Sequence, residues 1–219
     1  MVAFLRFWAR NGYHSPVLTI LTMSSPGSPA QSRHHHEVFS AKNAASLDTP
    51  FRRFLYHPDR LAERYVKYGD RVLDFGCGPG FFTREFAKRV GEIGQVYSVD
   101  LQEEMLAILR KKLDPEELMS RIRTHQCRPD TIGLPADLHG TFDTAFSIFV
   151  VHEVPDPEQL FREIFTLLKP GGTYFYTEPP FIVSGREFRE NLALAEEAGF
   201  RQVDRFWYFV NRAAVLKRE

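Results

Sequence analysis

Over the C-terminal two thirds of the chain, short apolar runs alternate with segments in which apolar residues recur every three or four positions. The run 71–75 leads into a glycine-rich turn, and apolar residues then recur at helical spacing over 82–90. Residues 95–99 form a second strand-like run that ends at Asp100, and a helical pattern over 105–113 follows it. This pattern predicts two successive strand–helix units.

Two further strands and a capped helix come next. Residues 121–126 form a weaker third strand, and 142–151 are almost entirely apolar, as expected of a strand buried on both faces of a sheet. Asp156 is followed by a proline and by a glutamine at the capping-box position, which predicts a helix running to about Leu168. The sequence KPGG at 169–172 ends that helix.

The last part of the chain predicts one more parallel strand and a hairpin. Residues 173–177 are a fifth strand, Ser184 opens a helix with a second capping box, and Gly199 closes it. Residues 200–208 and 213–217 are β-rich and separated by a short polar break, which indicates an antiparallel pair. The whole pattern predicts an α/β fold: a Rossmann-like, seven-stranded, mostly parallel sheet with helices on both faces and a C-terminal antiparallel hairpin.

The chain before residue 70 divides into two parts. Residues 1–36 hold three Arg, four His and no acid, and 24–32 are rich in Ser and Pro, so we expect 1–36 to be a disordered leader. An organelle transit peptide shares this composition, whereas arginines that interrupt the apolar start argue against a secretory signal. Residues 37–69 are expected to form an N-terminal helical or lid segment, and 70–219 the ligand-binding domain.

Composition excludes several classes of protein. Lys+Arg and Asp+Glu are 28 each in 219 residues, so we expect no general binding to nucleic acids. Two cysteines without C-x-x-C spacing predict neither a disulfide scaffold nor a zinc site, and three adjacent histidines at 34–36 cannot all face one ion, so we expect no metal. No apolar run reaches the roughly 20 residues of a membrane span. We expect a cytoplasmic protein, and the sequence leaves its oligomeric state open.

The glycine-rich turn after the first strand is the first candidate for ligand binding, because ligands of open α/β sheets bind beyond the carboxyl ends of the strands. Gly76, Gly78 and Gly80 let the backbone approach a ligand closely. A dinucleotide fingerprint requires G-x-G-x-x-G, but Phe81 stands at the third glycine position. Asp74 beside the turn would repel a pyrophosphate and attract a cation. The alternative is a tight strand–helix connection without a ligand.

Asp100 ends the second strand, 24 residues after Gly76. At that position a carboxylate accepts hydrogen bonds from the hydroxyls of a bound ribose. Leu101 and Met105 follow it and are candidates to flank an adenine ring. The alternatives are a solvated loop aspartate at 100 and a core-facing methionine at 105.

An ordered set of motifs in the chain resembles that of class I S-adenosylmethionine-dependent methyltransferases. The motifs are Val72–Thr83 (VLDFGCGPGFFT), Asp100, Asp130 ahead of a Leu-Pro pair, Phe142-Asp143 and Leu168–Gly172 (LKPGG). The resemblance covers about residues 48–217 and is strongest to small-molecule methyltransferases of the kind found in quinone biosynthesis. It implies S-adenosylmethionine as the cofactor and a methyltransferase domain over 70–219.

The resemblance also implies roles for individual residues. Asp74 and the backbone of 76–80 would hold the aminocarboxypropyl end of the cofactor, and Asp100 would hold the ribose. Asp130, with Thr131 beside it, corresponds to the acidic residue near the adenine amino group. An exposed loop aspartate is the alternative for Asp130.

The remaining candidates are fewer. Cys77 in the turn is interpreted as a small packing residue rather than a nucleophile. Phe149 follows the fourth strand, where the family's loop borders cofactor and acceptor. His152 is the group of that loop able to take a proton near neutral pH, and its alternative role is a hydrogen bond that positions the loop. Residues 43–57 would fold over the cofactor as a lid, or pack permanently as a helix.

These observations predict an enzyme that moves the methyl group of S-adenosylmethionine to a small-molecule acceptor of unknown identity. Two alternatives remain open at the level of sequence. The first is a catalytically degenerate methyltransferase fold that acts as a binding or scaffold subunit. The second is a nucleotide-cofactor oxidoreductase, which Phe81 at the third glycine position disfavours.

Overall fold

The computed structural model describes residue 41 and residues 49–219. The expectations for the leader 1–36, for its histidine tract and for most of the segment 37–48 lie outside the described residues. The strands are β1 Arg71–Phe75, β2 Gln95–Asp100, β3 Ile122–Gln126, β4 Phe142–Ile148, β5 Leu168–Glu178, β6 Phe200–Tyr208 and β7 Asn211–Arg218. The α-helices are α2 Pro50–Tyr56, α3 Pro58–Tyr65, α4 Thr83–Val90, α5 Glu103–Leu113, α6 Pro157–Leu167 and α7 Gly185–Glu197.

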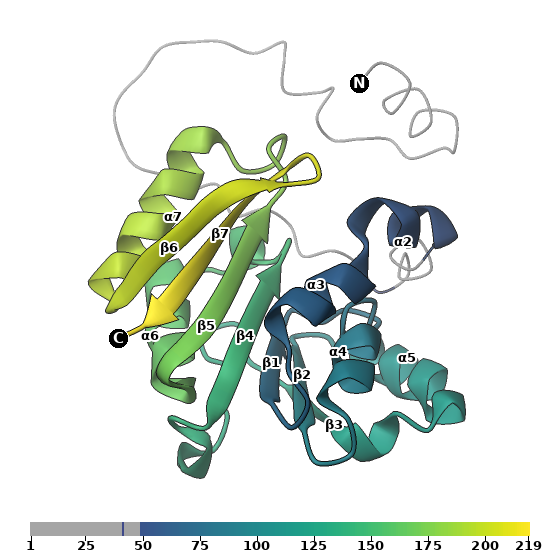
Figure 1. Cartoon of the computed structure of the whole chain (residues 1–219). Helices are drawn as coiled ribbons and strands as arrows, with labels where there is room; N and C mark the ends of the chain where they lie inside the picture. The colour runs from purple at the N-terminus through teal and green to yellow at the C-terminus, as the bar shows by residue number, and fades with distance from the viewer. Residues whose placement is uncertain (1–40, 42–48) are drawn as a thin grey trace. The chain divides into compact units, whose positions relative to one another are not determined.

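The strands form one seven-stranded sheet in the order β3-β2-β1-β4-β5-β7-β6 (Figure 1). The pairs among β1 to β5 are parallel, and β7 pairs antiparallel with both β5 and β6. This arrangement confirms the predicted Rossmann-like fold with its antiparallel C-terminal hairpin.

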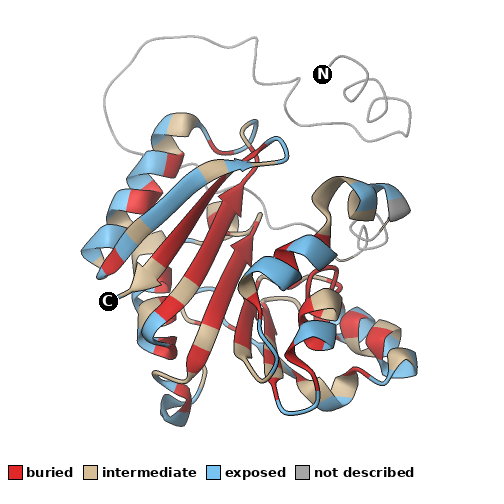
Figure 2. Cartoon of the chain, viewed as in Figure 1, coloured by how far each residue is buried: buried red, intermediate tan, exposed pale blue. Residues whose placement is uncertain are grey.

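Two hydrophobic cores cover the two faces of the sheet. One joins apolar residues of α3, α4 and α5 to the sheet, with Phe86 stacked on Phe146 at 4.2 Å between ring centroids. The other joins α6 and α7 to the sheet, with Tyr176 stacked on Phe188 at 4.9 Å. The central strands are therefore buried along most of their length (Figure 2), as the apolar run in β4 predicted.

The two predicted helix caps are present, but several strand boundaries differ from the prediction: β4 ends at Ile148 and not at residue 151, and β7 begins at Asn211 and not at residue 213. Asp156 accepts the N–H of Gln159 at 3.0 Å, and Ser184 accepts that of Glu187 at 3.1 Å. The motif at 169–172 lies inside β5, which begins at Leu168 rather than at residue 173. A register shift in the β4–β5 pairing accommodates these residues within the strand. The two glycines predicted a turn, but the strand continues through them.

The order of the strands reverses between β1 and β4. β1 connects through α4 to β2 on one side, whereas β4 leads through α6 to β5 on the other. The carboxyl ends of β1 and β4 therefore meet at the switch point of the sheet, which is where ligands of open α/β sheets bind. No helix in the described part of the chain is long and apolar enough to cross a membrane.

Candidate functional site

The turn after β1 is shaped by its glycines. Gly76, Gly78 and Gly80 have φ angles of 71°, 53° and 80°, which side chains rarely permit. The N–H of Gly76 donates to Val99 O at 2.8 Å, which ties the turn to β2. A Cβ at Gly76 would lie 2.3 Å from Cγ2 of Val150, in the loop after β4. The loops after β1 and β4 thus touch at the switch point.

Asp100 connects β2 to this turn. Its Oδ2 accepts the N–H of Gly78 at 2.8 Å, and its Oδ1 accepts that of Gln102 at 2.9 Å. The side chain is buried, and burial raises the pKa of Asp100 above its usual range although these hydrogen bonds lower it. A carboxylate has about four acceptor sites, so Asp100 can accept a ribose hydroxyl in addition to its backbone hydrogen bonds.

Asp74, in β1, lies beneath the same turn and is 3% exposed. Its Oδ2 accepts the hydroxyl of Thr83 at 2.5 Å. Burial raises the pKa of Asp74 to about 7, the Thr83 hydrogen bond lowers it, and the charge of Asp100 raises it further. Two buried carboxylates that repel each other favour a cation as their ligand.

The other residues predicted near the cofactor differ in their surroundings. Met105 is 2% exposed in α5, Leu101 is partly buried against the core, and Cys77 is 8% exposed. Burial raises the pKa of the Cys77 thiol well above its ordinary value, and Asp74 and Asp100 add to this effect. Cys77 therefore keeps its proton, which agrees with a packing role and not with a nucleophile.

Asp130 and Thr131 lie apart from the two buried aspartates. Asp130 is 73% exposed, and its Oδ1 accepts a hydrogen bond from the Nε of Arg128 at 3.2 Å. The Thr131 hydroxyl accepts the N–H of Gly133 at 3.0 Å. In this structure Asp130 has the surroundings of an exposed loop aspartate, and its adenine role stays a prediction.

The loop after β4 is held in a fixed conformation. Phe149 has a φ of 62°, and its N–H donates to Thr177 O at 2.9 Å. Two residues beyond Val150, the His152 ring lies with Nδ1 2.7 Å from Oε2 of Glu178. The sequence named both His152 and Phe149 as candidates, but Glu178 lies 26 residues away from its histidine, so no local pattern connects the two.

Tyr56, which the sequence did not single out, joins α2 to the site. Its ring centroid lies 5.4 Å from that of Phe149 and 6.0 Å from that of Phe209 in the β6–β7 turn. Its carbonyl accepts the hydroxyl of Tyr208. These two tyrosines are 152 positions apart, and no signal in the sequence could have revealed their contact.

α2 also packs on the glycine turn through its arginines. The guanidinium of Arg52 lies 5.3 Å from the ring centroid of Phe81, the residue after Gly80. The guanidinium of Arg53 lies 5.2 Å from the same centroid. Arg53 also pairs with Glu85 of α4 at 3.4 Å. In this structure residues 50–56 thus form a wall of the site.

We expect this wall to gain protection when the cofactor site is filled. Residues 50–57 contact the glycine turn through Phe81, so a ligand that rigidifies the turn should slow amide exchange in α2 by about fivefold, roughly 1 kcal/mol of local opening. Hydrogen exchange with and without S-adenosylhomocysteine measures this. α6, which is remote from the turn, serves as the control. Equal protection of residues 50–57 in both states would show a permanently packed helix and no lid.

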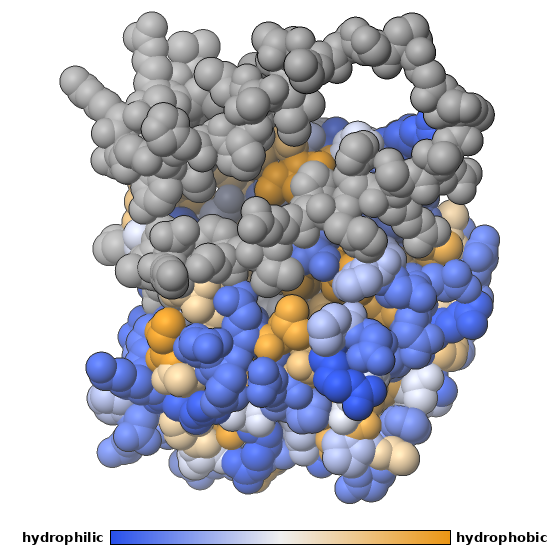
Figure 3. Space-filling view, turned by 180° about the vertical axis from the view of Figure 1, so that it is seen from behind, coloured by the Kyte–Doolittle hydropathy of each residue, from blue (hydrophilic) through white to orange (hydrophobic). Residues whose placement is uncertain are grey.

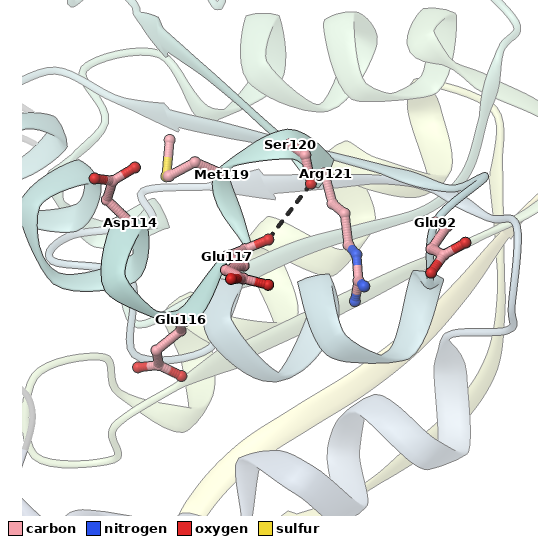
Figure 4. Close-up of a pocket in the computed structure, with 7 residues that line it drawn as sticks. All are labelled: Glu92, Asp114, Glu116, Glu117, Met119, Ser120 and Arg121. Carbon is pink, nitrogen blue, oxygen red and sulfur yellow. Dashed lines mark hydrogen bonds between the residues drawn. The ribbon is translucent and has the colours of Figure 1, made fainter.

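Two surface depressions lie near the amino ends of the strands, away from the switch point. One has a volume of about 620 Å³ and the other about 530 Å³. The first is lined by Glu92, Asp114, Glu116, Glu117, Met119, Ser120 and Arg121 (Figure 4). The side chains that line this depression are mainly charged. The described surface on the face shown in Figure 3 is mostly hydrophilic, with small separate hydrophobic groups. Their place away from the switch point and their open, charged lining separate both depressions from the candidate site.

Comparison with known proteins relates the chain to methyltransferases. Residues 73–176 match the family model of a methyltransferase domain. A demethylmenaquinone methyltransferase from Lactobacillus johnsonii is 37% identical over 107 residues, 49% of this chain and 43% of that protein. The ubiquinone/menaquinone biosynthesis C-methyltransferase UbiE of Yersinia pestis is 33% identical over 113 residues, 52% of this chain and 44% of that protein. The matched region thus spans less than half the length of these curated relatives.

Solved structures share the fold over most of the chain. A SAM-dependent methyltransferase from Aquifex aeolicus has a TM-score of 0.74 and 27% identity, covering 83% of this chain and all of that one. The [4+2]-cyclase SpnF has a TM-score of 0.60 and 21% identity, covering 74% of this chain and 81% of that one. These findings confirm the resemblance to class I S-adenosylmethionine-dependent methyltransferases. The cyclase shows that the fold does not by itself fix the reaction.

Proposed function

We propose that this chain, which has a class I S-adenosylmethionine-dependent methyltransferase domain, transfers the methyl group of that cofactor to a small-molecule acceptor. The observation that carries the proposal is the pair of buried carboxylates, Asp74 and Asp100, beside the glycine turn at the switch point. Both have raised pKa values because burial deprives them of solvent. A ligand with a positive charge and vicinal hydroxyls would supply the opposite charge and the hydrogen-bond donors that these two buried carboxylates lack.

The residues present fit S-adenosylmethionine. When bound, this cofactor supplies an electrophilic methyl group on a positively charged sulfur. Asp100 would accept hydrogen bonds from the ribose hydroxyls while it keeps Gly78 in place. Asp74 would face the cationic end of the ligand, and Met105 and Leu101 would border the adenine ring. Asp130, with Thr131 beside it, would lie near the adenine amino group.

The protein's contribution to the reaction is alignment and exclusion of water. The loop containing Phe149 and the wall formed by α2 both border the switch point, where the ring of Tyr56 in α2 packs on that of Phe149. Holding donor and nucleophile about 3 Å apart in a dry site is worth roughly 7–11 kcal/mol. His152 is the candidate for proton transfer with acceptors that must lose a proton.

An acceptor screen with methyl-labelled S-adenosylmethionine tests the proposal. Because the relatives in the comparison carry names from quinone biosynthesis, demethylated quinols form its first arm, and small amines, thiols and phenols form the others. We expect label in at least one acceptor, and loss of transfer in the Asp100→Ala variant. Tight S-adenosylhomocysteine binding without transfer to any acceptor would instead support a binding or scaffold subunit.

The protonation state of Asp74 yields a prediction on pH. Because its pKa of about 7 is raised in the folded protein, Asp74 is mostly protonated at pH 6, and a ligand ammonium should expel that proton. We expect release of roughly 0.5–0.9 proton on binding of S-adenosylhomocysteine at pH 6. Calorimetry in buffers of different ionisation enthalpy measures it, and Asp74→Asn should abolish it. Release that persists in that variant would assign the proton to another group.

A further inference from the structure

Glu178 is the last residue of β5, and its side chain is fully buried. Its Oε2 lies 2.7 Å from Nδ1 of His152, and its Oε1 accepts the backbone N–H of His152 at 3.3 Å. One carboxylate therefore contacts both the main chain and the ring of the same residue. This two-point contact fixes the path of the loop and the orientation of the imidazole together.

The loop that Glu178 holds reaches the glycine turn. Phe149, at its start, is tied to β5 by the hydrogen bond from its N–H to Thr177 O. Val150 then fills the space that a side chain at Gly76 would need. Between these points the chain has little freedom, so a shift at His152 moves Val150 against the turn.

Charges around His152 favour the imidazolium form. Oε1 of Glu153 lies 3.8 Å from Nε2, and Glu187 at the start of α7 adds a third carboxylate. Burial opposes the charge on the ring, but the hydrogen bond and charge of Glu178, with Glu153 and Glu187, outweigh it, and the pKa of His152 lies above its ordinary value. Arg212 on β7 is the strand partner of Glu178. Its guanidinium donates a hydrogen bond to Val183 O at 2.9 Å and lies over the ring of Trp207.

We propose that Glu178 is a positioning residue that acts through His152: it holds the loop after β4 against the glycine turn and so sets the affinity of the turn for the cofactor. This inference rests on the proposed function, because it assumes that the turn binds the cofactor. It makes no use of Glu178 or His152 as a group that touches the acceptor. The buried ion pair is the element that couples β5 to the cofactor site.

The proposal fixes the direction of a pH effect. The contact is an ion pair only while His152 is protonated, although the neutral ring can still donate Nδ1–H to Glu178, so the contact is strongest at low pH and weakens as the pH rises through the raised pKa of His152. Affinity for S-adenosylhomocysteine should fall over that range. Ionisation of Asp74 near pH 7 acts in the opposite direction, so the part of the pH effect that is due to His152 is identified by comparison with a variant that lacks the titrating ring.

The experiment compares Glu178→Gln with Glu153→Gln in the full chain. Both variants remove a carboxylate near the same ring, but only Glu178 contacts the backbone of His152. In Glu178→Gln we expect the His152 pKa, measured by NMR of labelled histidine, to fall by about one unit or more. We expect the affinity for S-adenosylhomocysteine, measured by calorimetry, to fall roughly tenfold. In Glu153→Gln both quantities should change much less.

A second variant covers the case in which Glu178→Gln does not fold. His152→Gln keeps a donor toward Glu178 without a titrating ring, so its ligand affinity should lose the decline with pH that the wild type shows. A folded Glu178→Gln with wild-type affinity, or a His152→Gln with the wild-type pH dependence, would overturn the positioning role. Wild-type protein that fails to bind S-adenosylhomocysteine would overturn the proposed function, and this inference with it.

Discussion

Replacement of Asp100 by Ala should weaken the binding of S-adenosylhomocysteine by about 1.5–3 kcal/mol, the scale of hydrogen bonds to a charged group. In the structure Asp100 bridges Gly78 and Gln102, so the variant loses both the expected ribose contacts and the anchor of the glycine turn. Isothermal calorimetry at constant pH measures the change, which corresponds to roughly a 10- to 150-fold increase in the dissociation constant.

Two further variants separate these contributions. Asp100→Asn keeps the shape and one acceptor oxygen, so it should retain more stability than Asp100→Ala but lose much of the affinity. Asp137→Ala removes an exposed aspartate from a short 3-10 helix and should change neither quantity. An Asp100→Ala protein that binds S-adenosylhomocysteine as tightly as the wild type would remove Asp100 from the cofactor site.

The fold could be predicted from the sequence because its signals are local. Strand–helix alternation, the caps at Asp156 and Ser184, and the apolar run in β4 each depend on neighbours within a few residues. Asp74, the glycines and Asp100 were found for the same reason, since topology places the ends of β1 and β2 beside each other. The error at 169–172 also has a local origin, because a strand that accommodates glycines resembles a turn.

The contacts that close the site could not be predicted. Tyr56 and Tyr208 are far apart in the sequence, and Glu178 at the end of β5 meets His152 in the loop after the neighbouring strand β4. Both contacts depend on side-chain placement after the sheet has formed, and the sequence carries no periodic trace of them. Asp130 matches a motif position in the sequence and lies in solvent beside Arg128 in the structure, so its adenine role stays a prediction.

Gly76→Ala should destabilise the protein more than Gly140→Ala does. Comparison of these two variants identifies the cause of the difference. Gly76 and Gly140 have similar φ angles of 71° and 64°, but a Cβ at Gly140 would meet nothing within 4 Å. Both variants should lose roughly 1–2 kcal/mol of unfolding free energy to backbone strain. Gly76→Ala should lose about 1–3 kcal/mol more, because Val150 must move away from the new methyl group.

Displacement of Val150 also makes Gly76→Ala a test of the contact between the two loops. Thermal unfolding should show the Gly76→Ala protein melting at least about 5 °C below the wild type, with Gly140→Ala in between. S-adenosylhomocysteine affinity should fall in Gly76→Ala alone, since only that turn borders the proposed cofactor site. Val150→Ala should recover part of the loss in the double variant, because it removes the branched methyl groups that collide. If Gly76→Ala and Gly140→Ala lose equal stability, the strain of the backbone explains both and the loop after β4 does not press on the turn.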